Sequence, residues 1–408
     1  MVHHHSNPSP LTDMSQLFFL VWLRKNLFNS WINTILTILL GTLLFNSLLK
    51  FGHWAGNFAK WEVIPQNLPL YFVGRFPPGE YWRLWLFLSL LMVMTGLTWG
   101  VLTRLSKGYL FNPTVLCGLA LAALTISIWP FIGDQPLLIR LQLSGLIVLL
   151  SVTAQISYWC GHLSFPWGQR LTLGWVVIFL IGLWLIMGGL GLPAISSIAW
   201  GGVLLTALMS LVSSILSFPF GILLALGRQS SLPVIRGLST LYIELVRGMP
   251  LITILFVGLI MVPLFLPSGW RLDVVFRAIL GLTLFVSAYL AETIRGGLQA
   301  IPKGQFEAAN SLGLNTPLTL GLIILPQALK ISIPAIVGLF ISLLQDTTLV
   351  SIVGLFDLLG ISRSILANPI FIGRHAEVYL FIGVLYWLLC YLMSQGSRYL
   401  EKQLRSHP

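Results

Sequence analysis

Charged residues are scarce in this chain of 408 residues, at 9% of the sequence, against ~25% in an ordinary soluble domain. Apolar residues make up 56% and include 24 Phe and 15 Trp. So much apolar surface excludes a disordered chain, and so few charges exclude a soluble fold. The solvent that suits this composition is a lipid bilayer.

Acidic residues and cysteines are also rare. The 12 Asp and Glu residues stand against 23 Lys and Arg, and the net charge is +11. The basic residues are spread between long uncharged runs, so they form no basic face for a nucleic-acid backbone. Cys117, Cys160 and Cys390 lie in apolar stretches without metal-ligand spacing, and the histidines are isolated. We therefore expect no disulfide framework, no metal site and no nucleic-acid partner.

Charge-free segments are what the chain has in abundance. A helix needs ~20 apolar residues to cross the hydrocarbon core, so these runs predict an all-α integral membrane protein with about ten transmembrane helices. With the amino end inside, the positive-inside rule places most Lys and Arg in the cytoplasm, together with both termini. The predicted spans are Asn26–Leu49, Leu84–Thr103, Gly108–Gly133, Leu141–Gln169, Leu171–Met187, Gly201–Leu226, Pro250–Leu266, Phe276–Ala291, Ile331–Leu355 and Val378–Ser397.

The two halves of the chain differ in where their charges fall. We expect a cytoplasmic segment over 1–30, an extension of about five helices over 31–195, a functional core over 196–400 and a cytoplasmic tail over 401–408. Only the core carries ionisable residues at or within the edges of apolar runs, where charge is expensive. Two pairs at i, i+3 spacing predict salt bridges at the cytoplasmic interface, namely Glu244 with Arg247 and Glu292 with Arg295.

A partly polar segment near 292–330 stands between two predicted spans. Pro302 can open a short helix there, and Gly313 can end it in a left-handed conformation. Asn315 or Thr316 then caps a second short helix that begins at Pro317. Two such helices, exposing small residues, form either a docking element for another protein or an ordinary loop rich in helix formers.

The residues of this segment match a known motif. Glu307, Ala308, Ala309, Gly313 and Pro326 have the spacing of the cytoplasmic "EAA" loop, so the segment resembles the membrane subunits of bacterial ATP-binding cassette (ABC) importers. The flanking runs AYLAETIRGGLQAIPKGQFEAANSLGLN and ELVRGMPLI resemble the polar amino-acid permeases of the HisM and HisQ type. The run GEYWRLWLFLSLLMVMTGLTWG in the front half resembles the longer general L-amino-acid permeases of the AapM type, which cyanobacteria also carry.

The resemblance implies a type I importer permease core in the last five helices, in the bacterial inner membrane, that carries polar or general L-amino acids. It also implies three partners, which are cytoplasmic ATPase subunits that use ATP and Mg²⁺, a second permease subunit (copy or paralogue), and a periplasmic solute-binding protein. The residues agree, since no lysine of the chain follows a glycine, whereas a phosphate-binding loop needs Gly-Lys. We expect this chain to be non-catalytic and to bind no cofactor itself.

One polar group lies part-way along a predicted span. Its carboxylate, Asp346, belongs either to a substrate pathway, where it binds the ammonium group of an amino acid, or to a structural ion pair or helix cap. The group comprises Gln345, Asp346, Thr347, Thr348 and Ser351. Two alternatives to an amino-acid importer stay open, namely a secondary ion-coupled transporter, although the halves lack internal symmetry, and an ABC permease for another small polar solute.

Overall fold

The computed structural model describes residues 21–105, 118, 137–160, 167–265, 267 and 272–405. By their contacts the residues fall into two units, 1–60 and 61–408, and each is described by itself. The first unit contains the long helix α2 (Trp31–Asn57), which Ser30 caps by accepting a hydrogen bond from the N–H of Asn33 at 3.3 Å. No residue of α2 is buried within its own unit, and its length and apolar composition suit a membrane span.

The second unit opens with the front part of the bundle. Its long helices are α5 (Tyr81–Leu105), α7 (Leu137–Cys160) and α8 (Trp167–Met187), preceded by the short α3 (Val63–Gln66), α4 (Leu68–Val73) and η1 (Pro78–Glu80). Helices α5 and α7 approach closely at Gly96 and Gly100, where a Cβ would overlap the main-chain oxygens of Leu150 and Ala154. Small residues one turn apart are a common contact between membrane helices.

The functional core follows from residue 197. Helix α13 is its centre, packed between α9 and α16 and the most buried of the candidate spans. Gly297 of α13 sits against the main chain of Ala328 in α16, so no larger residue fits there. The elements are η3 (Ser197–Ala199), α9 (Gly202–Arg228), α10 (Pro233–Gly248), α11 (Leu251–Phe256), η4 (Val257–Met261), α12 (Val262–Phe265), α13 (Val274–Gln299), α14 (Lys303–Ser311), α15 (Thr316–Leu318), η5 (Thr319–Ile324), α16 (Leu325–Asp346), η6 (Thr347–Val353), α17 (Leu358–Leu366), η7 (Pro369–Phe371) and α18 (His375–Arg405).

The described residues confirm an all-helical membrane architecture. They contain 8 helices long and apolar enough to cross a bilayer, or 9 when a bent pair counts as one span. The bent pair is α10 with the segment Leu251–Phe265, which turn by 106°. Met249, which precedes Pro250, is extended, as the residue before a proline prefers. The predicted span Gly108–Gly133 lies outside the described residues.

The predicted boundaries agree with the structure to different degrees. The single span predicted over Leu141–Gln169 corresponds to two elements, α7, which is described to Cys160, and α8, which begins at Trp167. The span predicted over Pro250–Leu266 corresponds to the segment Leu251–Phe265, which contains a π-helical turn between α11 and α12. Within the predicted loop near 292–330, α13 runs to Gln299 and the next long helical run starts at Thr316.

Candidate functional site

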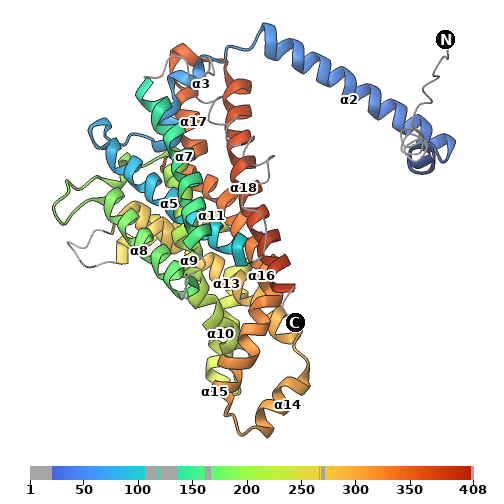
Figure 1. Cartoon of the computed structure of the whole chain (residues 1–408), viewed down its shortest axis with the longest axis vertical. Helices are drawn as coiled ribbons and strands as arrows, with labels where there is room; N and C mark the ends of the chain where they lie inside the picture. The colour runs from blue at the N-terminus through green and yellow to red at the C-terminus, as the bar shows by residue number, and fades with distance from the viewer. Residues whose placement is uncertain are drawn as a thin grey trace, which may run out of the picture. The chain divides into compact units, whose positions relative to one another are not determined.

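The short helix α14 stands at one end of the second unit, beyond the ends of α13 and α16 (Figure 1). It begins after Pro302, as predicted, and it ends with Gly313 in the left-handed region at φ +77°. The N–H of Leu314 donates to the oxygen of Ala309 at 3.1 Å, and the N–H of Gly313 donates to that of Asn310 at 2.9 Å. These two bonds form a Schellman cap, which fixes the direction of the chain after the helix.

The two faces of α14 have different surroundings. Glu307 and Ala308 are exposed, whereas Ala309 is buried and Phe306 packs against the apolar cluster that includes Ile294 and Ile324. The prediction that Ala309 belongs to an exposed small-residue surface is therefore wrong. Its small side chain instead lets α14 lie close to its own core, and the other four residues of the motif, Glu307, Ala308, Gly313 and Pro326, are exposed.

The segment after Gly313 is not a second short helix. Asn315 caps α15, accepting a hydrogen bond from the N–H of Leu318 at 3.1 Å, but α15 continues through the π-helical turn η5 into α16. The whole helical run, Thr316–Val353, spans 38 residues. Pro326 is exposed in the first turn of α16, and the wider π turn before it accommodates the missing N–H. The Gln327 amide donates to the Gln305 side chain at 3.4 Å, which joins α16 to α14.

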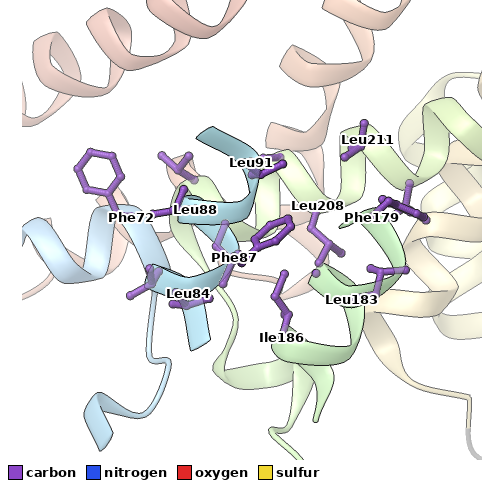
Figure 2. A pocket seen from close by; sticks show the side chains of 16 residues that line it. Phe72, Leu84, Phe87, Leu88, Leu91, Phe179, Leu183, Ile186, Leu208 and Leu211 are labelled. Atoms are coloured by element: carbon purple, nitrogen blue, oxygen red, sulfur yellow. The ribbon is translucent and has the colours of Figure 1, made fainter. Parts of the chain in front are cut away.

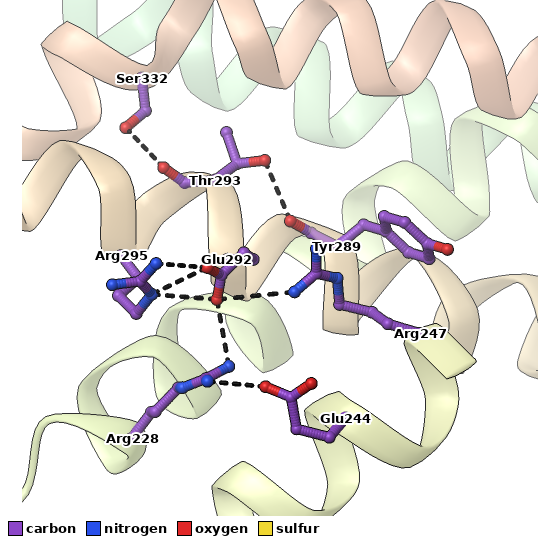
Figure 3. Close-up of polar contacts among 8 residues, drawn as sticks. All are labelled: Arg228, Glu244, Arg247, Tyr289, Glu292, Thr293, Arg295 and Ser332. Atoms are coloured by element: carbon purple, nitrogen blue, oxygen red, sulfur yellow. Dashed lines mark hydrogen bonds and ion pairs between the residues drawn. The ribbon is translucent and has the colours of Figure 1, made fainter. Parts of the chain in front are cut away.

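A cluster of charges joins three core helices, α9, α10 and α13 (Figure 3). Its centre is Glu292 of α13, which pairs with Arg295 on its own helix, with Arg228 of α9 at 3.2 Å and with Arg247 of α10 at 3.9 Å. Glu244 of α10 pairs with Arg228 at 2.7 Å. One carboxylate thus neutralises charges from α9, α10 and α13 in a partly buried place.

The pairing within this cluster differs in part from the prediction. The bond between Glu292 and Arg295 is present, but Glu244 pairs with Arg228 and not with Arg247. The reason is that Arg247 turns toward α13, where its guanidinium lies 5.5 Å from the ring centre of Tyr289 and reaches Glu292. Sequence reasoning missed Arg228, because it is distant in sequence from both acids that it joins.

The five predicted pathway residues at the end of α16 have different surroundings. Asp346 is the last residue of α16 and is half-buried, and no described residue forms a hydrogen bond or ion pair with its carboxylate. Gln345 is exposed, and its amide lies 3.6 Å from the sulfur of Cys390 in α18. Thr347 is fully buried and its hydroxyl donates to the oxygen of Leu344 at 2.8 Å.

The last two residues of the group, Thr348 and Ser351, are half-buried. The Ser351 hydroxyl donates to the oxygen of Thr348 at 2.8 Å. In this conformation Gln345, Asp346, Thr348 and Ser351 all retain some accessible surface, and their role in a pathway stays a prediction.

A second buried carboxylate, Asp357, was not among the predicted site residues. It caps α17, accepting hydrogen bonds from the N–H groups of Leu359 and Gly360 at 3.1 and 2.9 Å, and the Tyr386 hydroxyl of α18 donates to it at 3.3 Å. Complete burial raises the pKa of the Asp357 carboxyl to about 6, although these hydrogen bonds oppose the increase. Asp357 thereby joins α17 to α18 next to the start of α9.

These features define a class of protein: a multi-pass helical membrane protein with a small exposed helix at one end of its second unit and a cluster of ion pairs in its core. A family model described as the inner membrane component of binding-protein-dependent transport systems matches residues 217–406. The inner membrane amino-acid ABC transporter permease protein YhdY of Escherichia coli (strain K12) is 39% identical over 405 residues, which cover 95% of this chain and 93% of YhdY.

A second relative matches over nearly the whole length as well. The glutamate/glutamine/aspartate/asparagine transport system permease protein BztC of Rhodobacter capsulatus is 36% identical over 438 residues, 98% of this chain and 96% of BztC. A chain in the crystal structure of an amino acid ABC transporter with histidines is 30% identical and has a TM-score of 0.44, covering 48% of this chain and 90% of that one.

The chain belongs to the family of amino-acid ABC transporter permeases, and the resemblance drawn from its motifs is confirmed. It is a transporter permease subunit of the inner membrane that crosses the bilayer several times and works with ATPase and substrate-binding partners. The comparisons favour this function over that of a secondary ion-coupled transporter.

Proposed function

We propose that this chain forms the translocation pathway for polar L-amino acids in an ABC importer. The observation that carries the proposal is the similarity of both relatives over nearly their whole length, front half included. One is named for amino acids in general and the other for glutamate, glutamine, aspartate and asparagine. The substrate class is therefore small, polar and zwitterionic, and an ABC permease for another small polar solute is the second candidate.

The coupling surface in this proposal is the exposed face of α14. Glu307, Ala308 and Gly313 dock into a separate ATPase subunit, which binds and hydrolyses ATP with Mg²⁺, so this chain is not itself an enzyme and holds no cofactor. Two features support this role: the exposed residues project from the end of the bundle, and the buried ones, Phe306 and Ala309, fix α14 to the core. When the ATPase subunit displaces α14, the core moves with it as a whole, because packed helices move between discrete arrangements.

The charge cluster around Glu292 transmits the movement from helix to helix. Since Glu292 and Arg228 together contact α9, α10 and α13, these three helices move as one body while the cluster is intact. The apolar cluster beneath it includes Ile243 of α10, Ile294 of α13 and, at its edge, Phe306 of α14. This continuity from α14 to the charges supports the proposed path of force.

Asp346 is our candidate for the substrate pathway. Its half-buried carboxylate lies at the end of α16 without a described partner, and a carboxylate at membrane depth ordinarily faces a wet cavity or a ligand. It would bind the ammonium group of the amino acid, with Gln345, Thr348 and Ser351 nearby. If the Asp346→Asn variant of the reconstituted complex keeps its substrate affinity and rate, Asp346 is not part of the site.

The orientation follows from the coupling role. An ATPase that uses cellular ATP requires α14 in the cytoplasm, and the excess of Lys and Arg predicted on that side supports a cytoplasmic location for both termini. The partners are then two cytoplasmic ATPase subunits, a second permease that is a copy or a paralogue, and a periplasmic solute-binding protein.

Uptake by intact cells tests the substrate class. Cells that lack this chain should lose the ATP-dependent uptake of several polar amino acids while their proton gradient is intact, and the full-length chain should restore it. Normal amino-acid uptake together with loss of another solute would favour the second candidate, and uptake abolished by a protonophore at unchanged ATP would contradict both.

A further inference from the structure

An apolar groove lies between the front part of the second unit and its functional core. Figure 2 shows Leu84, Phe87 and Leu88 on the blue ribbon of α5, facing Leu183 of α8 and Leu208 of α9 on the green ribbons. The cavity has a volume of about 280 Å³, and every lining residue is a glycine or an apolar residue. An ordered water needs two to four polar partners, so water is a poor occupant.

The depth of the groove fits one leaflet of the bilayer. Its lining runs from Val203 to Val212 along α9, a rise of roughly 14 Å at 1.5 Å per residue. The hydrocarbon core of a bilayer is ~30 Å thick, so the groove covers about one half of it. The lining comes from the end of α4, the start of α5, the end of α8 and the start of α9.

The groove is open to the lipid-facing surface of the spans. Phe72, Leu88 and Leu211 on its rim are exposed by 43%, 38% and 51%, and Ala207 within it is exposed too. The exposed surface continues beyond the groove along α9 through Ile215. A chain that occupies the groove therefore enters sideways from the bilayer, in continuity with the surface that already contacts lipid.

We propose that this groove is a binding site for one acyl chain of a membrane lipid, drawn from the leaflet at the α8–α9 loop. The volume supports this occupant, since an apolar cavity of ~150 Å³ already holds benzene and the groove is larger and elongated along the helices. The bound chain completes the packing between the front half and the core. This inference concerns a surface away from α14 and the charge cluster, and it does not depend on the proposed substrate.

The test uses the full-length chain in bilayers that contain a phospholipid with a photoactivatable diazirine in its acyl chain. After illumination, cross-linked peptides are mapped by mass spectrometry. We expect labelling of residues 84–91 and 203–212 to exceed that of other exposed spans several-fold. Ala207→Trp fills the groove from an exposed position and should remove this excess. Leu223→Trp, on an exposed part of α9 that does not line the groove, should leave it unchanged.

Thermal stability gives a second readout. Adding phospholipid to the delipidated chain should raise the Tm of the wild type and of Leu223→Trp, and should raise that of Ala207→Trp much less. Equal labelling of all exposed spans, unaffected by Ala207→Trp, would overturn the proposal. A second outcome would also overturn it. If Leu88→Cys forms a disulfide efficiently with cysteines placed in residues 108–133, and the lipid does not label the groove, the occupant is the chain itself.

Discussion

The front part of the second unit and its core are both built from apolar spans, but they hold together in different ways. Helices α5 and α7 meet through Gly96 and Gly100 and through apolar side chains. The core adds partly buried charges, among which Glu292 draws together arginines from α9, α10 and α13. A partly buried charge is costly unless it is paired, and this difference between the two parts is consistent with our proposal that coupling belongs to the core.

A buried charge pair in the front part sharpens this contrast. Arg83 is fully buried, pairs with Glu80 at 2.8 Å and donates to the oxygen of Pro193 at 2.9 Å. These bonds tie the start of α5 to the loop between α8 and α9. The pair holds local elements in place, whereas the Glu292 cluster links helices that the proposed mechanism requires to move together.

The largest effect is expected at the exposed end of α14. Gly313→Leu should lower uptake by about tenfold or more, equivalent to ~1.4 kcal/mol, because the new side chain stands on the docking face and strains a left-handed residue. ATPase stimulation should fall with uptake, while the amount of protein in the membrane is unchanged. Gly373→Leu is the matched control, since Gly373 is also left-handed, exposed and free of neighbours around its Cβ position. If both variants lost uptake equally, backbone strain alone would explain the loss, and Gly313 would have no docking role.

Two buried glycines compare the halves directly. Gly297→Leu and Gly100→Leu should both lower stability by ~1–3 kcal/mol, because each drives a side chain into the main chain of a neighbouring helix. Uptake per folded complex should fall strongly for Gly297→Leu, which separates α13 from α16, and should be nearly normal for Gly100→Leu. The measurements are thermal unfolding and uptake normalised to folded protein. If Gly100→Leu lost uptake to the same extent, the assignment of movement to the core would be wrong.

The charge cluster provides a smaller, graded effect. Glu292→Gln removes the central carboxylate and leaves three arginines without it, so stability should fall by ~1–3 kcal/mol and the ratio of stimulated to basal ATPase activity should fall with it. Glu244→Gln is the control. It contacts only Arg228 among the described ion pairs and is more exposed, and such pairs are worth ~0–1 kcal/mol. A normal stimulation ratio in Glu292→Gln would limit the cluster to a structural role.

The smallest effect concerns Asp357 and pH. Burial raises its pKa to about 6, above the value in the unfolded chain, so the protonated form favours folding. That stability is present below about pH 4 and is lost as the pH rises through about 6. The hydrogen bonds from Leu359, Gly360 and Tyr386 and the charge of Arg363 oppose this increase in the pKa without cancelling it.

The Asp357→Asn variant measures this effect. Its Tm relative to the wild type should rise between pH 5 and pH 7, because the asparagine still caps α17 without a charge. Asp357→Ala should be less stable than Asp357→Asn by ~1 kcal/mol at every pH, because alanine removes the cap and neither residue is charged. A difference between Asn and wild type that does not change with pH would contradict the raised pKa.

Most of the fold could be predicted from the sequence, because charge-free runs and their breaks have direct physical causes. The break at Gly188 and Gly189, both left-handed, and the Gly313 cap follow from local chemistry alone. The bend at Pro250 and the length of the run from Thr316 could not be predicted so well. There the tertiary environment decides whether a helix breaks or continues past a proline, as it does past Pro326 and Pro334.

The site was predictable in its motif but not in its contacts. The exposed positions of Glu307 and Ala308 agree with the sequence interpretation, whereas the burial of Ala309 depends on how α14 packs against the apolar cluster. Likewise the spacing of Glu244 and Arg247 indicates a pair within one helix, but Arg228 arrives from α9 and competes for the acid. Partners from distant helices are not visible in local spacing.

The most direct test of the account is transport by proteoliposomes that contain this chain and its partner permease, with the solute-binding protein outside and labelled glutamate as substrate. The account predicts uptake only when the ATPase subunits and ATP are present on the α14 side of the membrane. Uptake driven by an ion gradient in the absence of the ATPase subunits would contradict it.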